Sequence, residues 1–195
     1  MLLLNYVVDQ QPRLGAKTEN GVIDVAAVVG MLAAEGDQTP TTMEALVAGG
    51  PEARAALARL LAEVADQSEA DFMLDEADLQ LSYCVPKPEK ILCVGLNYRK
   101  HAAESGMAIP ETPVLFSKFN NALAAPGEAI PLLAEVDKYD YEVELAVVMG
   151  RRARYVSEAE ALDYVLGYCT ANDISERGLQ FRTGQWLLVG VLRSQ

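Results

Sequence analysis

The stretch that decides the fold is Asp-Tyr-Glu-Val-Glu-Leu-Ala-Val-Val-Met at residues 140–149, together with Tyr-Cys-Thr-Ala-Asn-Asp at residues 168–173. The first segment is mainly apolar and the second is strand-like, and we expect both to form strands. Side chains alternate between the two faces of a strand, so Glu142 and Glu144 point the same way. Neighbouring carboxylates repel each other unless a positive charge lies between them. This face therefore predicts either a cation site or a solvated strand surface.

A third carboxylate shifts the balance towards a cation site. Asp173 lies in Ala-Asn-Asp-Ile-Ser at residues 171–175, after a second apolar run. Oxygen ligands alone favour magnesium, manganese or calcium over zinc.

Working outward, residues 90–106 read Lys-Ile-Leu-Cys-Val-Gly-Leu-Asn-Tyr-Arg-Lys-His-Ala-Ala-Glu-Ser-Gly and hold the only histidine of the chain. We expect a strand over 91–94 and a short helix over 98–105, in which His101 and Glu104 share one face. A carboxylate one turn away can orient the imidazole, which makes a base able to take a proton from water near neutral pH. The alternative is a surface or structural histidine.

Lys118 closes a third expected strand, over residues 113–118. Its ammonium could neutralise a substrate carboxylate, and the alternative is an exposed lysine at a strand end.

The first 80 residues carry strand and helix signals but no group with evident chemistry. Strands are expected over 2–8 and 13–25, with a tight turn at Asn20-Gly21. Three helices are expected from their start signals: residues 26–36 after Asp24, residues 43–50 after a capping box of Thr41 with Glu44, and residues 52–66 after Pro51.

In the second half of the chain, a capping box of Ser157 with Glu160 predicts a helix over residues 160–168.

A proline-punctuated connector, Pro-Lys-Pro-Glu-Lys at residues 86–90, favours extended conformations. We place a domain boundary near residue 85, which gives a small N-terminal domain over 1–85 and a second domain over 86–195.

Composition excludes several classes of protein. The net charge of -12 repels phosphate backbones and anionic membranes, so neither nucleic acid nor a membrane is an expected partner. No apolar run has transmembrane length and residues 1–8 lack the features of a signal peptide, so we expect a cytoplasmic protein. The three cysteines show no paired spacing, which predicts reduced thiols rather than disulfides or a thiolate metal site.

Four motifs, taken in order, resemble those of the fumarylacetoacetate hydrolase family of metal-dependent enzymes. They are Val-Gly-Leu-Asn-Tyr-x-x-His-Ala-x-Glu, Pro-Val-Leu-Phe-x-Lys, Asp-Tyr-Glu-x-Glu-Leu and Ala-Asn-Asp-Ile-Ser. The resemblance covers Pro86 to about Trp186, and the preceding residues are similar to the small N-terminal domain of many bacterial members. It implies an α+β fold, in which a small N-terminal α+β domain precedes a layered mixed β-sheet catalytic domain, and it implies a homodimer.

The resemblance also implies roles for single residues. Glu142, Glu144 and Asp173 match the metal ligands of the family, and His101 with Glu104 matches a pair that activates water beside the metal. Gln180 and Arg177 match residues that contact the substrate, although Gly178 stands where the family commonly has aspartate.

The last residues depart from the family pattern. Members continue after the Gln-Trp pair with a Gly-Lys-Ser/Thr segment, which residues 187–195 lack. We interpret this as the sign of a truncated or frame-shifted product, whose sheet would lack neighbours and expose apolar faces.

The leading hypothesis is a magnesium- or manganese-dependent enzyme that hydrolyses a carbon–carbon bond in a 2-oxo or β-diketo acid. Alternatives within the family are an isomerase, a tautomerase or a decarboxylase of a related oxo acid in aromatic catabolism. Outside it, the alternatives are an inactive fragment and a metal-dependent nuclease, and the negative charge argues against the nuclease.

Overall fold

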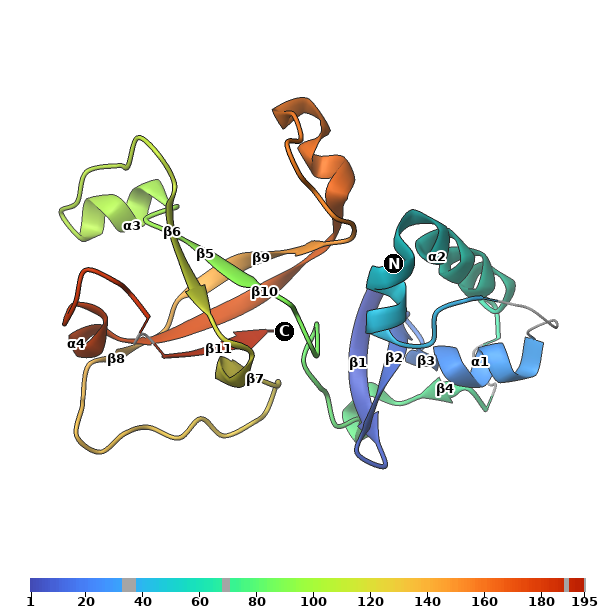
Figure 1. Cartoon of the computed structure of the whole chain (residues 1–195). Coiled ribbons are helices and arrows are strands. Elements are labelled where there is room, and N and C mark those ends of the chain that lie inside the picture. Colours follow the sequence, from blue (N-terminus) through green and yellow to red (C-terminus); the bar gives the residue numbers. More distant parts are fainter. Residues whose placement is uncertain (33–37, 68–70, 188–189, 195) are drawn as a thin grey trace.

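The computed structural model describes residues 1–32, 38–67, 71–187 and 190–194, and the side chains of residues 188–195 are not described. Three sheets are formed within the described residues (Figure 1). One belongs to the N-terminal half, and two belong to the half that begins at residue 91. The fold is α+β, as expected.

The first sheet consists of β1 (Leu2–Val8), β2 (Gln11–Lys17), β3 (Val22–Asp24) and β4 (Met73–Leu74), paired in that order and antiparallel throughout. The expected turn at Asn20-Gly21 joins β2 to β3. Gly21 has a φ of 142° and lies so close to Leu74 that a Cβ would stand 2.6 Å from its carbonyl oxygen. Only glycine fits this turn without strain.

Two helices cover this sheet. The side chain of Asp24 accepts the Ala26 N–H at 3.0 Å and begins α1 (Val25–Leu32), as expected; the remaining predicted residues, 33–36, lie outside the described ones. Helix α2 (Met43–Glu63) is capped by Thr42, so the expectation of Thr41 as the cap was wrong. The two helices expected over 43–66 are continuous except for a kink at Gly50, whose φ is 58°.

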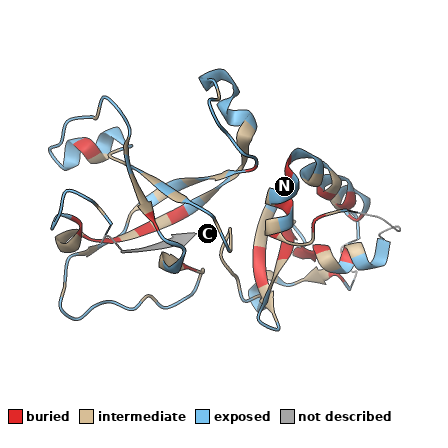
Figure 2. Ribbon diagram, viewed as in Figure 1, coloured by how far each residue is buried: buried red, intermediate tan, exposed pale blue. Residues whose placement is uncertain are grey.

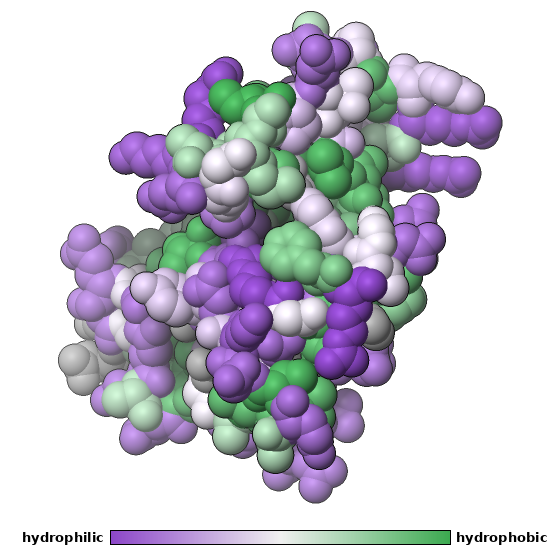
Figure 3. Space-filling view, turned by 90° about the vertical axis from the view of Figure 1, so that its left-hand side faces the viewer, coloured by the Kyte–Doolittle hydropathy of each residue, from purple (hydrophilic) through white to green (hydrophobic). Residues whose placement is uncertain are grey.

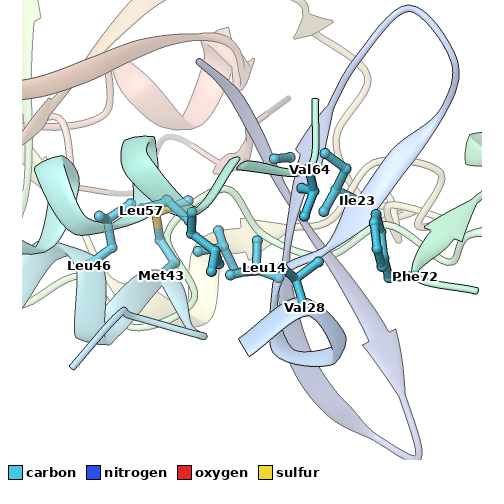
Figure 4. Packing of buried hydrophobic residues seen from close by; sticks show 11 residues of the cluster. Leu14, Ile23, Val28, Met43, Leu46, Leu57, Val64 and Phe72 are labelled. Carbon is cyan, nitrogen blue, oxygen red and sulfur yellow. The ribbon is translucent and has the colours of Figure 1, made fainter. Parts of the chain in front are cut away.

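The hydrophobic core of the N-terminal half lies between the first sheet and these helices (Figure 4). Leu14 and Ile23 from the sheet meet Val28 from α1, together with Met43, Leu46, Leu57, Val64 and Phe72. Leu166, from the other half of the chain, packs against the same cluster.

The connector first follows β1. After β4 come the short 3-10 helix η1 (Glu76–Asp78) and a stretch whose backbone bonds to β1, with Val7 N–H on Gln80 O at 2.9 Å and Ser82 N–H on Asn5 O at 2.8 Å. The buried Asn5 side chain also donates to Tyr83 O and Cys84 O, at 2.8 and 2.9 Å. The expected domain boundary near residue 85 stays a prediction. The hydrogen bonds show only that residues 80–84 bind to β1, in the N-terminal half.

The second half begins with β5 (Ile91–Gly95), which pairs antiparallel with β6 (Val114–Lys118). Helix α3 (Arg99–Glu104) lies between them in the chain, and Gly106 ends it with a φ of 64°. All three elements were expected from the sequence within one or two residues.

The third sheet is built on the long strand β10 (Val165–Glu176). Strands β8 (Tyr139–Asp140) and β9 (Val143–Met149) pair antiparallel with different parts of β10. On its other side lies β11 (Gly190–Ser194), which is antiparallel to β10 and parallel to the short β7 (Leu123–Ala124) that follows η2 (Asn120–Ala122). The backbone of β10 therefore has neighbours on both sides near residues 171–175, where a sheet without neighbours had been expected, whereas residues 165–170 pair with β9 alone among the described residues.

Two elements differ from their predictions. The strand expected over 141–149 is interrupted at residues 141–142, so Glu142 precedes β9. The helix expected over 160–168 is a 3-10 helix, η3 (Glu158–Tyr164), because the residues from Val165 onward pair with β9 instead. Ser157 does contact Glu160, with Oγ and Oε2 2.6 Å apart, but its side chain caps no backbone N–H.

Much of the second half is coloured as exposed in Figure 2, and its exposed residues include apolar ones. Val143, Leu145, Val147 and Met149 alternate along β9 and are 46–69% exposed. We call these four residues the outer β9 face. No helix among the described residues is both long and apolar enough to cross a membrane.

Candidate active site

A cavity of about 650 Å³ opens between α3, the end of β5, the β8–β9 segment, the end of β10 and α4 (Arg177–Gln180). Figure 3 views the molecule from the side of α3 and α4, and shows a hydrophilic area bordered by hydrophobic surface. The cavity is lined by all the residues singled out in the sequence except Lys118, namely His101, Glu104, Glu142, Glu144, Asp173, Arg177 and Gln180.

The pairing of β9 with β10 brings the three carboxylates together. Glu144 is the register partner of Ala171, and the Asp173 N–H donates to Glu142 O at 2.8 Å. Directly paired residues share a face of the sheet, and so do residues two apart in one strand. Glu142, Glu144 and Asp173 therefore lie on the same face although the third is distant in sequence.

Lys118 lies behind this cluster rather than in the cavity. Its Nζ is 2.6 Å from Asp173 Oδ1, and both side chains are 3% exposed. The alternative of an exposed strand-end lysine is therefore wrong. The carboxylate that Lys118 neutralises in this structure is that of Asp173.

Arg177 is the second cation of the site. Its Nε and Nη2 donate to Asp140 Oδ2 at 3.1 and 2.8 Å, and its Nη1 lies 2.9 Å from both Gln180 Oε1 and Glu142 Oε1. Ser175 Oγ also donates to Glu142 Oε1, at 3.0 Å. The guanidinium is thus held between the β8 and α4 sides of the cavity.

The charges at the site are unevenly compensated. Two cations, Lys118 and Arg177, contact Asp173 and Glu142, whereas Glu144 has no cationic contact among the described residues. Burial, then the charges of Asp173 and Glu142, raise the pKa of Glu144 to about 7. Burial also raises the pKa of Asp173, although Lys118 opposes it. A further positive charge would relieve this cluster.

The donor set fits a hard divalent cation in its chemistry, since it offers three carboxylates in a half-buried cavity. Across the described residues, no three histidine, cysteine, aspartate or glutamate side chains are arranged to hold a metal ion as they stand. One oxygen of each of two carboxylates is engaged by a cation, since Asp173 Oδ1 faces Lys118 and Glu142 Oε1 faces Arg177.

His101 and Glu104 line the cavity from α3. Within the described part of the chain, no hydrogen bond joins their side chains, and Glu104 is exposed. Tyr98, just before the helix, accepts the backbone N–H of Leu145 on its hydroxyl at 3.0 Å. This bond ties the residue that precedes α3 to β9.

Aromatic side chains form the remaining wall. Trp186, the only tryptophan, packs edge-on against Phe116 and Phe181, with ring centroids 5.7 and 6.4 Å apart. It also covers Gly95, where a Cβ would lie 2.5 Å from Trp186 Cζ3. Glycine at the end of β5 is therefore required by the close approach of the indole.

Sequence reasoning missed Asp140, Ser175 and Tyr98 as parts of the site. Asp140 continues the two-residue alternation of Glu142 and Glu144, and Ser175 is two residues beyond Asp173, so the strand period could have found both. Tyr98 gave no signal, because its hydroxyl bonds a backbone group on another sheet.

Comparison with known proteins places this site in a family. The model of the family described as "Fumarylacetoacetate (FAA) hydrolase C-terminal" matches residues 90–193, more than half of the chain. The match runs past Trp186, where we had expected the resemblance to stop.

Relatives agree with this match. The chain is 53% identical over 104 residues to the fumarylacetoacetate hydrolase domain-containing protein 2 homolog of Dictyostelium discoideum, covering 52% of this chain and 34% of that protein. The 2-hydroxyhepta-2,4-diene-1,7-dioate isomerase from Mycobacterium marinum is similar in structure over 63% of this chain and 46% of its own, with a TM-score of 0.54 and 34% identity.

The maleylpyruvate hydrolase from Sphingobium sp. SYK-6, in complex with manganese(II) and pyruvate, has the same fold over the whole of this chain and 65% of its own, with a TM-score of 0.70 and 22% identity. The chain thus spans roughly a third to two thirds of the length of these proteins. The sequence motifs, the sheet arrangement and the family match agree: this chain belongs to the fumarylacetoacetate hydrolase family.

Proposed function

We propose that the chain is a divalent-metal-dependent enzyme that hydrolyses a carbon–carbon bond in a 2-oxo or β-diketo acid. The single observation that carries this proposal is the convergence of Glu142, Glu144 and Asp173 on one face of the β9–β10 pair, in a cavity that also contains His101. Three acidic side chains and one histidine that line the same cavity suit a substrate acid that carries adjacent oxygen ligands.

Glu142, Glu144 and Asp173 would hold the metal, and magnesium or manganese suits their oxygen donors. When bound, such an ion supplies Lewis-acid stabilisation of the negative charge that develops on the oxo acid. The remaining steps fall to the protein. Lys118 would keep Asp173 ionised, because it opposes the effect of burial on the pKa of that carboxyl.

His101 would act as the general base that takes a proton from water. It stands on α3 at the edge of the cavity, and Tyr98 anchors that helix to β9. Glu104, one turn further on, would orient the imidazole after turning inward from its exposed position. The hydroxide formed in this way would attack the carbonyl next to the bond that breaks. The departing carbon would leave with the bonding electrons as an enolate, and the proton held by His101 would return to it.

Arg177 and Gln180 would bind the substrate carboxylate. Asp140 orients the planar guanidinium of Arg177 by accepting from its Nε and Nη2, so a substrate carboxylate would bind at the Nη1 end, where Glu142 lies in this structure. Gln180 accepts from Arg177 through Oε1, which leaves its amide N–H₂ available to donate to the substrate.

An isomerase or tautomerase of a related oxo acid is the second candidate. The observation in its favour is the likeness to the M. marinum isomerase at 34% identity. In this proposal both reactions would use the same metal ligands. They would differ in whether a water molecule can bind beside His101. A turnover assay that follows both loss of substrate and formation of the cleaved acid distinguishes them.

The partner expected for this chain is a second copy. The outer β9 face exposes four apolar side chains in a row, and an apolar strip of this kind suits a self-complementary dimer interface.

Calorimetric titration of the chain with magnesium and manganese tests the metal proposal. We expect wild type to bind one of them and Glu142→Ala to lose binding, whereas the control Glu135→Ala, which changes an exposed acid outside the cavity, keeps it. Turnover of an acylpyruvate or oxaloacetate should follow binding. A folded chain that binds neither metal would rule out the proposed ligands.

A further inference from the structure

The residue that precedes Arg177 carries a buried charge with no part in the proposed reaction. Glu176 is 2% exposed, and its carboxylate points away from the cavity into backbone. Its Oε1 accepts the N–H of Lys138 at 2.9 Å, and its Oε2 accepts the N–H of Leu179 in the first turn of α4. Burial raises the pKa of this carboxyl, but the N–H groups of Leu179, Lys138 and Gly178 outweigh it and lower the pKa overall.

These two bonds join both sides of the Arg177 site. Lys138 lies two residues before Asp140, the main partner of the Arg177 guanidinium, and Lys138 O also accepts the Arg177 N–H at 2.9 Å. Leu179 lies between Arg177 and Gln180 in α4. One carboxylate therefore fixes the segment that carries Asp140 and the short helix that carries Arg177 and Gln180.

The position after Arg177 is matched to this arrangement. A Cβ built on Gly178 would stand 3.1 Å from Glu176 Oε2 and 3.2 Å from Oε1. No left-handed backbone conformation requires glycine here, so the constraint is space alone. Because residue 178 is glycine, no side chain crowds the space that the Glu176 carboxylate occupies.

We propose that Glu176 is the positioning residue for Arg177 and Gln180, and that Gly178 leaves the room that its carboxylate occupies. The claim rests on the proposed function, in which those two side chains bind the substrate carboxylate. Loss of the Glu176 carboxylate frees two backbone N–H groups, α4 shifts against Asp140, and the guanidinium no longer meets the substrate in one orientation. Because Glu176 acts through Arg177 and Gln180, the main effect falls on substrate binding.

The test uses Glu176→Ala, Gly178→Asp and the double variant, with Glu135→Ala as the matched control. A Cβ at position 178 points at the Glu176 carboxylate, so in the double variant the aspartate introduced by Gly178→Asp returns a carboxylate to the vacated space. We expect each single change to raise KM for oxaloacetate about tenfold with a smaller change in kcat, and the double variant to recover most of the loss. If the losses of the two single variants simply add in the double variant, the proposal is wrong.

A second readout needs no turnover. The Arg177 Nε–H, assigned by its loss in Arg177→Lys, should exchange slowly with solvent in wild type and in the double variant, and rapidly in Glu176→Ala. An unchanged exchange rate in a folded Glu176→Ala chain would overturn the positioning role. If wild type turns over no oxo acid, the proposed function fails, yet the exchange rate still decides the role of Glu176.

Glu176→Ala leaves two buried N–H groups unpaired and is the variant most at risk of not folding. Gly178→Ala keeps the carboxylate and adds only the crowding Cβ. We expect it to speed the exchange of the Arg177 Nε–H in the same direction. Unchanged exchange in a folded Gly178→Ala chain would remove Gly178 from the proposal.

Discussion

Lys118 and Asp173 form an ion pair in which both side chains are 3% exposed and the charged atoms are 2.6 Å apart. No hydrogen-bond partner of Lys118 Nζ other than this carboxylate lies within the described residues. A buried ammonium with one contact is costly unless the partner keeps its negative charge. The pair therefore couples the ionisation of a proposed metal ligand to the stability of β6 against β10.

Lys118→Met should lower the free energy of unfolding by about 3 kcal/mol at pH 8, because it leaves Asp173 buried and unpaired. The loss should shrink at pH 5. Without Lys118 the pKa of Asp173 rises further, and a carboxyl whose folded pKa lies above its unfolded value stabilises the fold at low pH and loses that contribution as pH rises. Urea unfolding in EDTA at both pH values measures this. The exposed Lys100→Met is the control, and a loss that is equal at pH 5 and pH 8 would contradict the coupling.

Glu144 predicts a pH dependence of the metal-free protein. Its pKa is raised to about 7, above the value of about 4.3 for an unfolded glutamate, so the folded chain holds a proton that the unfolded chain releases. Stability should fall as pH rises from 5 to 8, and Glu144→Gln should lack this part of the fall. Melting temperatures in EDTA supply the comparison. Manganese should flatten the wild-type plot of melting temperature against pH. If wild type and Glu144→Gln show the same dependence on pH, Glu144 is not destabilised by the neighbouring carboxylates.

Gly95→Ala should displace Trp186, since the new Cβ would overlap the indole. We expect destabilisation of about 1–3 kcal/mol and a red shift of tryptophan emission, which in this chain comes from Trp186 alone. Gly184→Ala is the control, because no atom lies within 4 Å of a Cβ at that position. An unshifted spectrum in Gly95→Ala would mean that the indole does not rest on the end of β5.

Val147→Lys tests whether a second copy covers the outer β9 face. A charge in the middle of this strip should convert the expected dimer to a monomer, because a lysine cannot be buried there without a partner. Light scattering on a size-exclusion column gives the mass. Leu162→Lys, an exposed apolar residue on η3, serves as the control. A wild-type chain that is monomeric at high concentration removes the prediction altogether.

Period and spacing placed Glu142 with Glu144 and His101 with Glu104, whereas Arg177 and Gln180 were singled out only by the resemblance to the family. Glu142, Glu144 and Asp173 converge because strand alternation and antiparallel pairing act on neighbouring stretches, and the motifs marked both stretches. His101 and Glu104 were placed in one helix by local signals, and α3 forms where they predicted it. Local patterns therefore sufficed wherever local hydrogen bonding decides the conformation.

Tertiary contacts decided the rest. The sequence around Lys118 did not distinguish an exposed lysine from a buried one. Its pairing with Asp173 depends on how the β5–β6 hairpin packs on the third sheet. Residues 165–168 have helix-forming neighbours, but pairing with β9 makes them part of β10. Glu176 gave no signal in the sequence, because its burial follows from the loop at Lys138, which no local pattern places.

The connector has a consequence for how the chain can be divided. Because Asn5 and the backbone of β1 hold residues 80–84, the stretch between the halves that lacks such bonds begins only after Cys84 and ends where β5 starts at Ile91. Limited digestion with trypsin should therefore cut after the exposed Lys90, since Lys87 is followed by proline. The N-terminal fragment would carry away the strand-like segment 80–84, so an expression boundary drawn before residue 80 would strip β1 of its edge partner.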